Sequence, residues 1–432
     1  MWPFQRNAPR SAGPIRSSQP YWLMRNGIGD ARPRATSRTS EHDIVIIGAG
    51  ITGALVADAL VSTGRRILVL DSRDPAQGST AASTALLQYE IDTHLVDLAQ
   101  LVGPERATLA YRAGVAVFPL LERRFPELLA ASSYERRDSL YLASSPKDVP
   151  RLQAERAARA AIGIDCTWLE GAELERRFHC HRSGGLLSTL GAQLDPVRLT
   201  RGVLAGCERH GVEIRTRETV TAIEDAGEHQ RLTLESGDTL TARDVVVCAG
   251  YESLRFLPAA AQSSIDVHNT FALVTEPLAS GARVSSLPLI WESARPYLYL
   301  RTTQDGRMIV GGEDLPFKNA AARDVLLPRQ VRRLAAGYRE LFDAELPPVA
   351  YTWAGSFAET QDGLPYIGSV PGLNPRLRFA LCYGGNGISY SVHAGDLIRA
   401  GIEGRDHALA DVFGFARSGA DLSGGRQSGV AG

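Results

Sequence analysis

Three glycines followed by an aspartate form the most informative spacing in this chain. Gly48, Gly50 and Gly53 make a G-x-G-x-x-G motif directly after the β-branched run 44–47, and Asp71 lies 18 residues beyond the last glycine. Glycines in this pattern allow a tight turn and a close backbone approach to a pyrophosphate, and a carboxylate at this distance can accept hydrogen bonds from a ribose. The motif therefore predicts a dinucleotide site whose acid disfavours a 2′-phosphate.

The elements that must position this motif are a strand, a helix and a second strand. Residues 44–47 read as a buried parallel strand, 54–63 as a helix that ends at Gly64, and 67–70 as the next strand. The N-terminus of such a helix presents unpaired N–H groups and a positive dipole end to phosphates. The order predicts an α/β protein with a Rossmann-type domain.

Two further segments offer contacts to a long ligand. The segment 78–87 (GSTAASTALL) is small and hydroxyl-rich, and we expect it to open a helix that runs to about residue 101. A glycine turn at 384–387 follows an expected strand end and precedes an expected helix that reaches about residue 402. The first motif alone leaves FAD and NAD open, and segment 78–87 is also typical of an empty, Ser/Thr-capped helix start. A second glycine-rich helix N-terminus favours a flavin, because it can face negative charge on the reduced ring.

Composition excludes several other classes of protein. The 432 residues include 47 basic and 48 acidic side chains, which gives no basic excess for nucleic acid. We find no run of about 18 apolar residues, so we predict no membrane span. The five cysteines form no C-x-x-C motif, and the histidines of His179-Cys180-His181 have no further ligand at metal-binding spacing. We therefore predict no metal site.

Taken together, the motifs resemble those of the D-amino-acid oxidase (DAO) superfamily of FAD enzymes, which includes glycine oxidase and monomeric sarcosine oxidase. The resemblance covers about residues 42–412 and is strongest to a bacterial branch of that superfamily. The segments that carry it are 48–53 with Asp71, 78–87, 191–196, 245–250, 299–312, 353–365 and 384–387.

The resemblance implies a discontinuous Rossmann-type FAD-binding domain of the GR2-like kind, interleaved with an α+β substrate domain that carries a mostly antiparallel sheet. We assign residues 41–137, 186–255 and 354–412 to the FAD-binding domain, and 138–185 with 256–353 to the substrate domain. Residues 1–40 are Arg- and Ser-rich and are expected to be a partly mobile extension, although the apolar cluster 21–24 can dock on the folded body. Residues 413–432 are expected to form a flexible tail.

The resemblance also assigns the cofactor contacts. These are Gly48, Gly50, Ile51, Thr52, Gly53, Asp71, Ser79, Thr80, Ser83, Val220, Ala249, Gly250, Gly385, Asn386, Gly387 and Ile388. Some relatives attach FAD through a histidine or a cysteine, at places that Ala82 and Gly355 occupy here. We therefore predict non-covalent FAD, with a link through Cys382 as the alternative.

Substrate contacts depart from the family pattern. Amino-acid-oxidising relatives place an arginine just after Trp-Ala-Gly, where it clamps the substrate carboxylate. Phe357 occupies that place here, so we take Tyr299, Arg301 and Phe357 as the catalytic candidates, with Arg301 as the replacement clamp. Tyr297 and Glu313 are further pocket candidates. If no arginine serves, the substrate is an amine without a carboxylate.

The function that follows is oxidation of a C–N bond in a small-molecule amine or amino acid, by hydride transfer to flavin N5, with oxygen or another electron acceptor. One alternative is a dehydrogenase that passes electrons to a quinone or carrier. The other is a flavin-bearing subunit or partner-dependent flavoprotein without turnover alone. We expect a cytoplasmic location. Organellar import is the alternative that the Arg/Ser-rich start leaves open.

Overall fold

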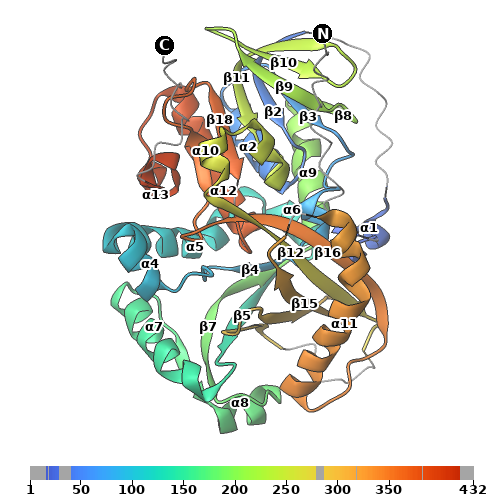
Figure 1. Ribbon diagram of the computed structural model, residues 1–432, viewed down its shortest axis with the longest axis vertical. Coiled ribbons are helices and arrows are strands. Elements are labelled where there is room, and N and C mark those ends of the chain that lie inside the picture. The colour runs from blue at the N-terminus through green and yellow to red at the C-terminus, as the bar shows by residue number, and fades with distance from the viewer. Residues whose placement is uncertain are drawn as a thin grey trace, which may run out of the picture.

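The computed structural model describes residues 16–17, 19–28, 40–278, 287–317, 319–381 and 383–418, with the side chains at 16, 17, 320 and 418 excepted. Two β-sheets divide the molecule, one above the other in Figure 1. Helices α2, α9 and α12 lie beside the upper sheet, and helices α7, α8 and α11 lie at the periphery of the lower sheet. The α/β fold class predicted from the sequence is confirmed.

The upper sheet has the strand order β17-β18-β11-β2-β3-β8, and the pairs from β18 to β8 are parallel. Its strands are β2 (Glu41–Ile47), β3 (Ile67–Asp71), β8 (Glu213–Thr216), β11 (Thr239–Val247), β17 (Tyr366–Ser369) and β18 (Leu377–Leu381). The apolar runs of β2 and β3 are buried on both faces, as expected for parallel strands covered by helices. Strands β9 (Val220–Asp225) and β10 (Gln230–Leu234) extend β11 as an antiparallel hairpin region.

The lower sheet has the order β1-β16-β12-β15-β14-β13-β5-β7-β4, and β6 also pairs with β7. Every pair is antiparallel except β13 with β5. Its strands are β1 (Arg16–Ser17), β4 (Leu86–Gln88), β5 (Glu135–Leu142), β6 (Thr167–Glu170), β7 (Gly184–Gln193), β12 (Ile265–Thr275), β13 (Leu289–Glu292), β14 (Leu298–Thr302), β15 (Met308–Leu315) and β16 (Val349–Thr360). The mostly antiparallel sheet that the resemblance implied is therefore confirmed.

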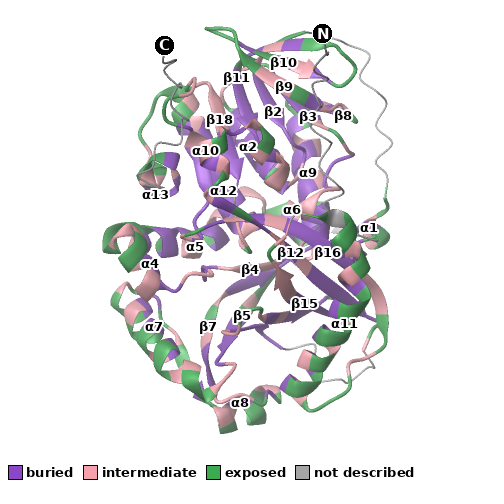
Figure 2. Ribbon diagram, viewed as in Figure 1, coloured by how far each residue is buried: buried purple, intermediate pink, exposed green. Residues whose placement is uncertain are grey.

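The helices of the described residues cover both sheets. They are α1 (Tyr21–Asn26), α2 (Ile51–Val61), α3 (Ser79–Ala82), α4 (Leu95–Val102), α5 (Pro104–Arg124), α6 (Pro126–Ala131), α7 (Val149–Ala161), α8 (Gly171–Phe178), α9 (Pro196–Arg209), α10 (Ala259–Gln262), α11 (Ala320–Phe342), α12 (Gly387–Glu403) and α13 (Ala410–Phe413), with 3₁₀ turns at Pro146–Asp148, Gly250–Phe256 and Phe415–Ser418. Figure 2 shows the burial that results, with the strands of both sheets largely purple and the outward faces of α7, α8 and α11 green. Of the helices in the ranges given above, none is both long and apolar enough to cross a membrane.

The division into two domains stays a prediction. Strands β4, β7 and β16 belong to the lower sheet, although the predicted FAD-binding domain contains all of β4 and most of the other two. Strand β16 is 12 residues long and pairs with β12 over its whole length, so it crosses the predicted boundary at residue 354.

The prediction of one continuous helix from segment 78–87 to about residue 101 is wrong. Residues 79–101 form the short helix α3, then strand β4, then α4, instead of one continuous helix. Ala85 has a left-handed φ of 56°, and Leu86–Gln88 pairs with β7, so tertiary strand pairing replaces the local helical pattern. The apolar cluster near the start of the chain does dock as predicted, because Tyr21, Trp22 and Leu23 of α1 are buried.

Candidate active site

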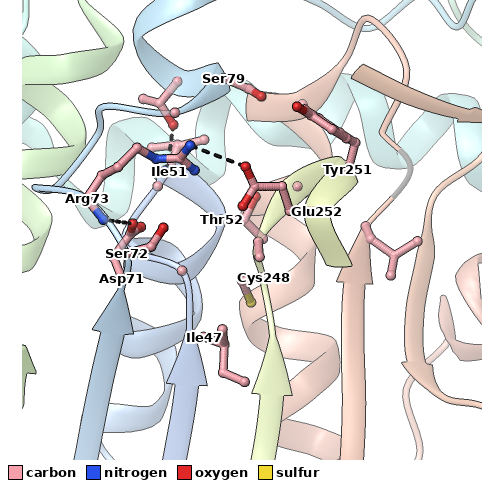
Figure 3. A pocket seen from close by; sticks show the side chains of 18 of the residues that line it. Ile47, Ile51, Thr52, Asp71, Ser72, Arg73, Ser79, Cys248, Tyr251 and Glu252 are labelled. Atoms are coloured by element: carbon pink, nitrogen blue, oxygen red, sulfur yellow. Dashed lines mark hydrogen bonds and ion pairs between the residues drawn. The ribbon is translucent and has the colours of Figure 1, made fainter. Parts of the chain in front are cut away.

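A first cavity lies at the carboxyl ends of β2, β3 and β11, where open parallel sheets usually bind ligands (Figure 3). It encloses about 1120 Å³, including space open to solvent. The lining comes from the glycine motif, from segment 78–83 and from the turn before α12. The three segments singled out in the sequence therefore meet at one cavity.

Two glycines hold the end of α2 against the sheet. A Cβ on Gly53 would lie 1.8 Å from the carbonyl oxygen of Gly48, and one on Gly48, at φ 117°, would lie 2.4 Å from that of Cys248. No side chain fits at either place. The amide of Ile51 donates to Thr80 Oγ1 at 3.0 Å, which fixes α3 beside the start of α2. The first amides of a helix have no intrahelical acceptor, so this end is suited to a pyrophosphate.

Asp71 is fixed by its own backbone surroundings. Its two carboxylate oxygens accept the amides of Ala49 at 2.7 Å and Arg73 at 2.8 Å. Burial raises the pKa of Asp71 above its ordinary value. Each oxygen keeps a further lone pair, so the carboxylate is positioned to accept ribose hydroxyls.

The lining residues at this end that the sequence analysis missed include Arg73, Tyr251, Glu252 and Arg255. Arg73 Nη1 lies 3.3 Å from Glu252 Oε1, and Figure 3 shows this pair beside the ends of the strands. Arg255 Nη2 donates to the carbonyl of Val220 at 2.7 Å. Their only sequence signal was that they follow the ends of β3 and β11.

Most of the predicted cofactor residues line the first cavity: Gly48, Gly50, Ile51, Thr52, Asp71, Ser79, Thr80, Ser83, Val220, Ala249, Gly250, Gly387 and Ile388. Gly53 lies beneath the helix as a packing residue, and Gly385 and Asn386 line a second cavity instead. Their roles as FAD contacts stay predictions.

The second cavity adjoins the first at the glycine turn and encloses about 980 Å³, including open space. Ser79, Ser83, Phe357, Gly384 and Gly387 line both cavities. The lower sheet provides much of the remaining wall through Trp291, Tyr299 and Asp314, and Tyr297 just before β14 adds to it.

The glycine turn approaches one carboxylate closely. A Cβ on Gly385 would lie 3.2 Å from Asp92 Oδ2 and 3.5 Å from Tyr297 Oη. Asn386 Nδ2 donates to the carbonyl of Glu90 at 2.6 Å, which ties the start of α12 to the segment that carries Glu90 and Asp92. The turn therefore lies directly beside acidic side chains.

The charge of the second cavity is one-sided. Its lining includes Glu90, Asp92 and Asp314, and among the residues that the structure describes there it has no arginine, lysine or histidine. Burial raises the pKa of Glu90 to about 7, although Arg159 opposes the shift. Burial also raises the pKa of Asp314 to about 7.

Two of the three catalytic candidates reach this cavity. Tyr299 and Phe357 both line it. The hydroxyls of Tyr299 and Thr270 share a hydrogen bond at 3.0 Å, and the Phe357 ring stacks on His268 with centroids 5.6 Å apart. Phe357 also lines the first cavity, so it lies where the two spaces meet.

The expected role of Arg301 as a carboxylate clamp is contradicted. Arg301 is 2% exposed, and its Nε and Nη2 donate to the carbonyls of Thr84 at 2.7 Å and Leu194 at 3.0 Å. It lies beyond Tyr299 on β14, under segment 82–85, and lines neither cavity. Burial lowers the pKa of Arg301 to about 9.

Arg301 is one of three buried donors that hold consecutive carbonyls of this segment. Trp353 Nε1 donates to Ala82 at 2.8 Å, Trp22 Nε1 to Ser83 at 2.8 Å, and Arg301 to Thr84. Residues 82–84 line the second cavity, and Ser83 also lines the first, so the three donors position the wall that the cavities share at Ser83.

Glu313 is a second misplaced candidate. It lines neither cavity, and its carboxylate lies 2.6 Å from Arg333 Nε on α11. The next residue, Asp314, lines the second cavity instead. Adjacent residues of a strand point to opposite sides. The side chain of β15 that faces the cavity is therefore Asp314, one position after the predicted Glu313.

Comparison with known proteins identifies the class. The chain belongs to the DAO family of FAD-dependent oxidoreductases, whose family model matches residues 43–400. FAD is therefore its cofactor, and the glycine cradle, the α2 end and Asp71 fit that group. Neither Ala82 nor Gly355 offers a nucleophile for a covalent link, and Cys382 lies outside the described residues.

Individual relatives are distant. The chain is 20% identical to the probable oxidoreductase OrdL of Haemophilus influenzae over 87% of this chain and 86% of that protein. It is 24% identical to a glycine oxidase of Bacillus licheniformis, over 83% and 92%. The crystal structure of glycine oxidase from Geobacillus kaustophilus superimposes with a TM-score of 0.70 at 20% identity, over 87% of this chain and 98% of that one. The L-proline dehydrogenase of P. horikoshii also gives 0.70, at 16% identity, over 89% and 100%.

Proposed function

We propose that this protein oxidises the C–N bond of a small-molecule amine or amino acid with FAD, and passes the electrons to oxygen or another acceptor. The observation that carries this proposal is the junction of the two cavities. One cavity has the backbone features of a dinucleotide site, the other is lined by aromatic and acidic side chains, and the glycine turn at 384–387 borders both. A substrate in the second cavity would therefore lie against whatever fills that end of the first.

Bound FAD supplies a two-electron acceptor that can take a hydride from carbon. In the substrate a C–H bond and an N–H bond break and a C=N bond forms, so one hydride and one proton leave. The residues of this chain must hold the reacting carbon about 3–3.5 Å from the acceptor atom. Tyr299 and Phe357 are the side chains that we assign to this positioning, since both line the second cavity and Phe357 also borders the first.

The proton has a suitable acceptor. Amines enter as ammonium ions, and an ammonium ion has no lone pair to assist hydride loss. Burial holds the pKa of Asp314 at about 7, so this carboxylate can take up a proton near neutral pH. The N-terminus of α12 at Gly387 presents a positive dipole end to negative charge that develops nearby.

Anaerobic reduction of the purified, FAD-loaded protein tests the proposal. The visible flavin band would be followed through a panel of amines, D- and L-amino acids and N-methylated glycines. Bleaching by one class supports C–N oxidation, and re-oxidation by air then separates an oxidase from a dehydrogenase. A yellow protein that no compound bleaches would contradict the proposal and favour a partner-dependent flavoprotein.

A further inference from the structure

We infer that the second cavity selects a cationic amine that carries no carboxylate on the reacting carbon, with Asp92 and Asp314 as the residues that determine this specificity. The inference rests on the proposed function and names its substrate class. It rejects the amino-acid half of that proposal, because the described lining of this cavity offers carboxylates and no cationic side chain.

One carboxylate at the second cavity has a buried oxygen without a donor among the described residues. Glu90 lines the second cavity and is 3% exposed. Its Oε1 accepts from Ser139 Oγ at 3.0 Å and lies 3.7 Å from Arg159 Nη1. Its Oε2 is buried and has no hydrogen-bond partner within the described ranges. A buried carboxylate oxygen without a donor is costly to ionise, and an ammonium ion in the adjoining cavity would stabilise the ionised carboxylate through its charge.

The other two acids of the second cavity also line a neighbouring cavity. Asp92 and Asp314 line the second cavity and also an outer cavity of about 780 Å³, open space included, that shares Tyr297 and Phe357 with it. Asp314 Oδ1 is also buried without a hydrogen-bond partner in the described part of the chain. A cation in either cavity therefore lies near these two carboxylates, which would repel an anion.

Nearby positive groups are already engaged by acids. Arg295 lines only the outer cavity, where its Nη2 donates to the carbonyl of Asp92 at 3.0 Å and lies 3.6 Å from Asp92 Oδ1. His268 Nε2 lies 3.8 Å from Glu359 Oε2 in the same outer cavity. Arg159 lies behind Glu90 and pairs more closely with Glu155, at 2.8 Å. None of the three lines the second cavity, so none is placed there to clamp a carboxylate.

Equilibrium binding tests this inference without relying on turnover. The oxidised, FAD-loaded protein would be titrated with tetramethylammonium and separately with acetate, and binding read from the perturbation of the visible flavin spectrum. Tetramethylammonium has no lone pair and is not oxidised by this route. We expect the cation to bind and acetate to bind at least about tenfold more weakly.

Substitutions of single acids show which carboxylates bind the cation. Asp314→Asn keeps the shape of the side chain and should weaken tetramethylammonium binding by about tenfold or more, and Asp92→Asn provides a second test if the first variant does not fold. The control is Glu313→Gln, the adjacent acid, whose carboxylate pairs with Arg333 outside the cavity. It should leave cation binding unchanged.

The outcomes separate this inference from the proposed function. Tighter binding of acetate than of the cation, or unchanged cation binding in Asp314→Asn and Asp92→Asn, would overturn the inference even if an amino acid bleaches the flavin. Selective cation binding by a protein that no amine reduces would support the charge selectivity and contradict the proposed oxidation.

Discussion

The two adjoining cavities are built on different principles. The first depends on backbone: glycines that exclude any Cβ, the amides at the start of α2, and Asp71 held by two amides. The second depends on single side chains from separate strands and loops, such as Asp92, Tyr299 and Asp314. A backbone site tolerates little change, whereas a side-chain site can change its substrate by one substitution.

Gly53→Ala should have the largest effect. The added methyl would lie 1.8 Å from a backbone carbonyl oxygen, so α2 must move away from β2. We expect a protein that retains little FAD or is recovered unfolded, measured by flavin content and circular dichroism. Gly206→Ala on α9 is the control, because its Cβ would meet only the end of the Arg209 side chain, at 3.7 Å. Full flavin content in Gly53→Ala would contradict the proposed cradle.

Arg301→Gln should destabilise residues 82–85, which line the second cavity. It removes charged donors from two carbonyls, those of Thr84 and Leu194, at a buried position. We expect a loss of about 3 kcal/mol or more in the free energy of unfolding, together with weaker FAD retention. Chemical denaturation measures the first effect, and the exposed Arg329→Gln on α11 is the control. A stable variant with a raised KM alone would instead indicate that Arg301 binds substrate.

Phe357→Arg should change the ligand preference of the second cavity from a cation to a carboxylate. Phe357 lines the second cavity where the resemblance places an arginine in amino-acid oxidases, so the variant introduces a cation that can pair with a carboxylate. Acetate binding should strengthen by about tenfold, and tetramethylammonium binding should weaken. Phe357→Leu is the matched uncharged change. Unaltered anion binding in Phe357→Arg would show that this position does not face the ligand.

The smallest effect concerns pH and stability. The pKa of Asp314 is raised to about 7, so between its unfolded pKa of about 4 and pH 7 the folded protein binds more protons than the unfolded chain. The contribution of Asp314 to the free energy of unfolding therefore falls as pH rises, and it is lowest above about pH 7. Asp314→Asn should raise the melting temperature more at pH 8 than at pH 5. The exposed Asp138→Asn provides the baseline, and an equal change at both pH values for Asp314→Asn would contradict the shifted pKa.

The sequence was informative where function depends on consecutive residues. The motif at 48–53, the acid at 71 and the turn at 384–387 are local patterns, and all contribute to the first cavity or to its packing. The second cavity was harder to predict because its members meet only through strand pairing. Arg301 shares strand β14 with Tyr299, but its side chain lies under residues 82–85. Glu313 and Asp314 are adjacent, and only the strand pairing of β15 determines that Asp314 faces the cavity.

Segment 78–87 shows the same limit in its secondary structure. Its small and hydroxylic residues predicted a helix and a ligand contact. Ser79, Thr80 and Ser83 do line the first cavity, but the helix ends at Ala82 because Leu86–Gln88 pairs with a strand about a hundred residues later in the chain. Composition indicated the contact, whereas long-range pairing determined the backbone.

The most direct test of the account compares two compounds that differ by one carboxylate. 1-Aminobutane and norvaline each carry one amine, and norvaline differs only by a carboxylate on the carbon that bears it. Anaerobic stopped-flow reduction of the FAD-loaded protein would give the bleaching rate and the half-saturating concentration for each. We expect 1-aminobutane to bleach the flavin at lower concentration than either enantiomer of norvaline. Bleaching by norvaline in preference to 1-aminobutane, or by neither compound, would contradict selection of an amine without a carboxylate.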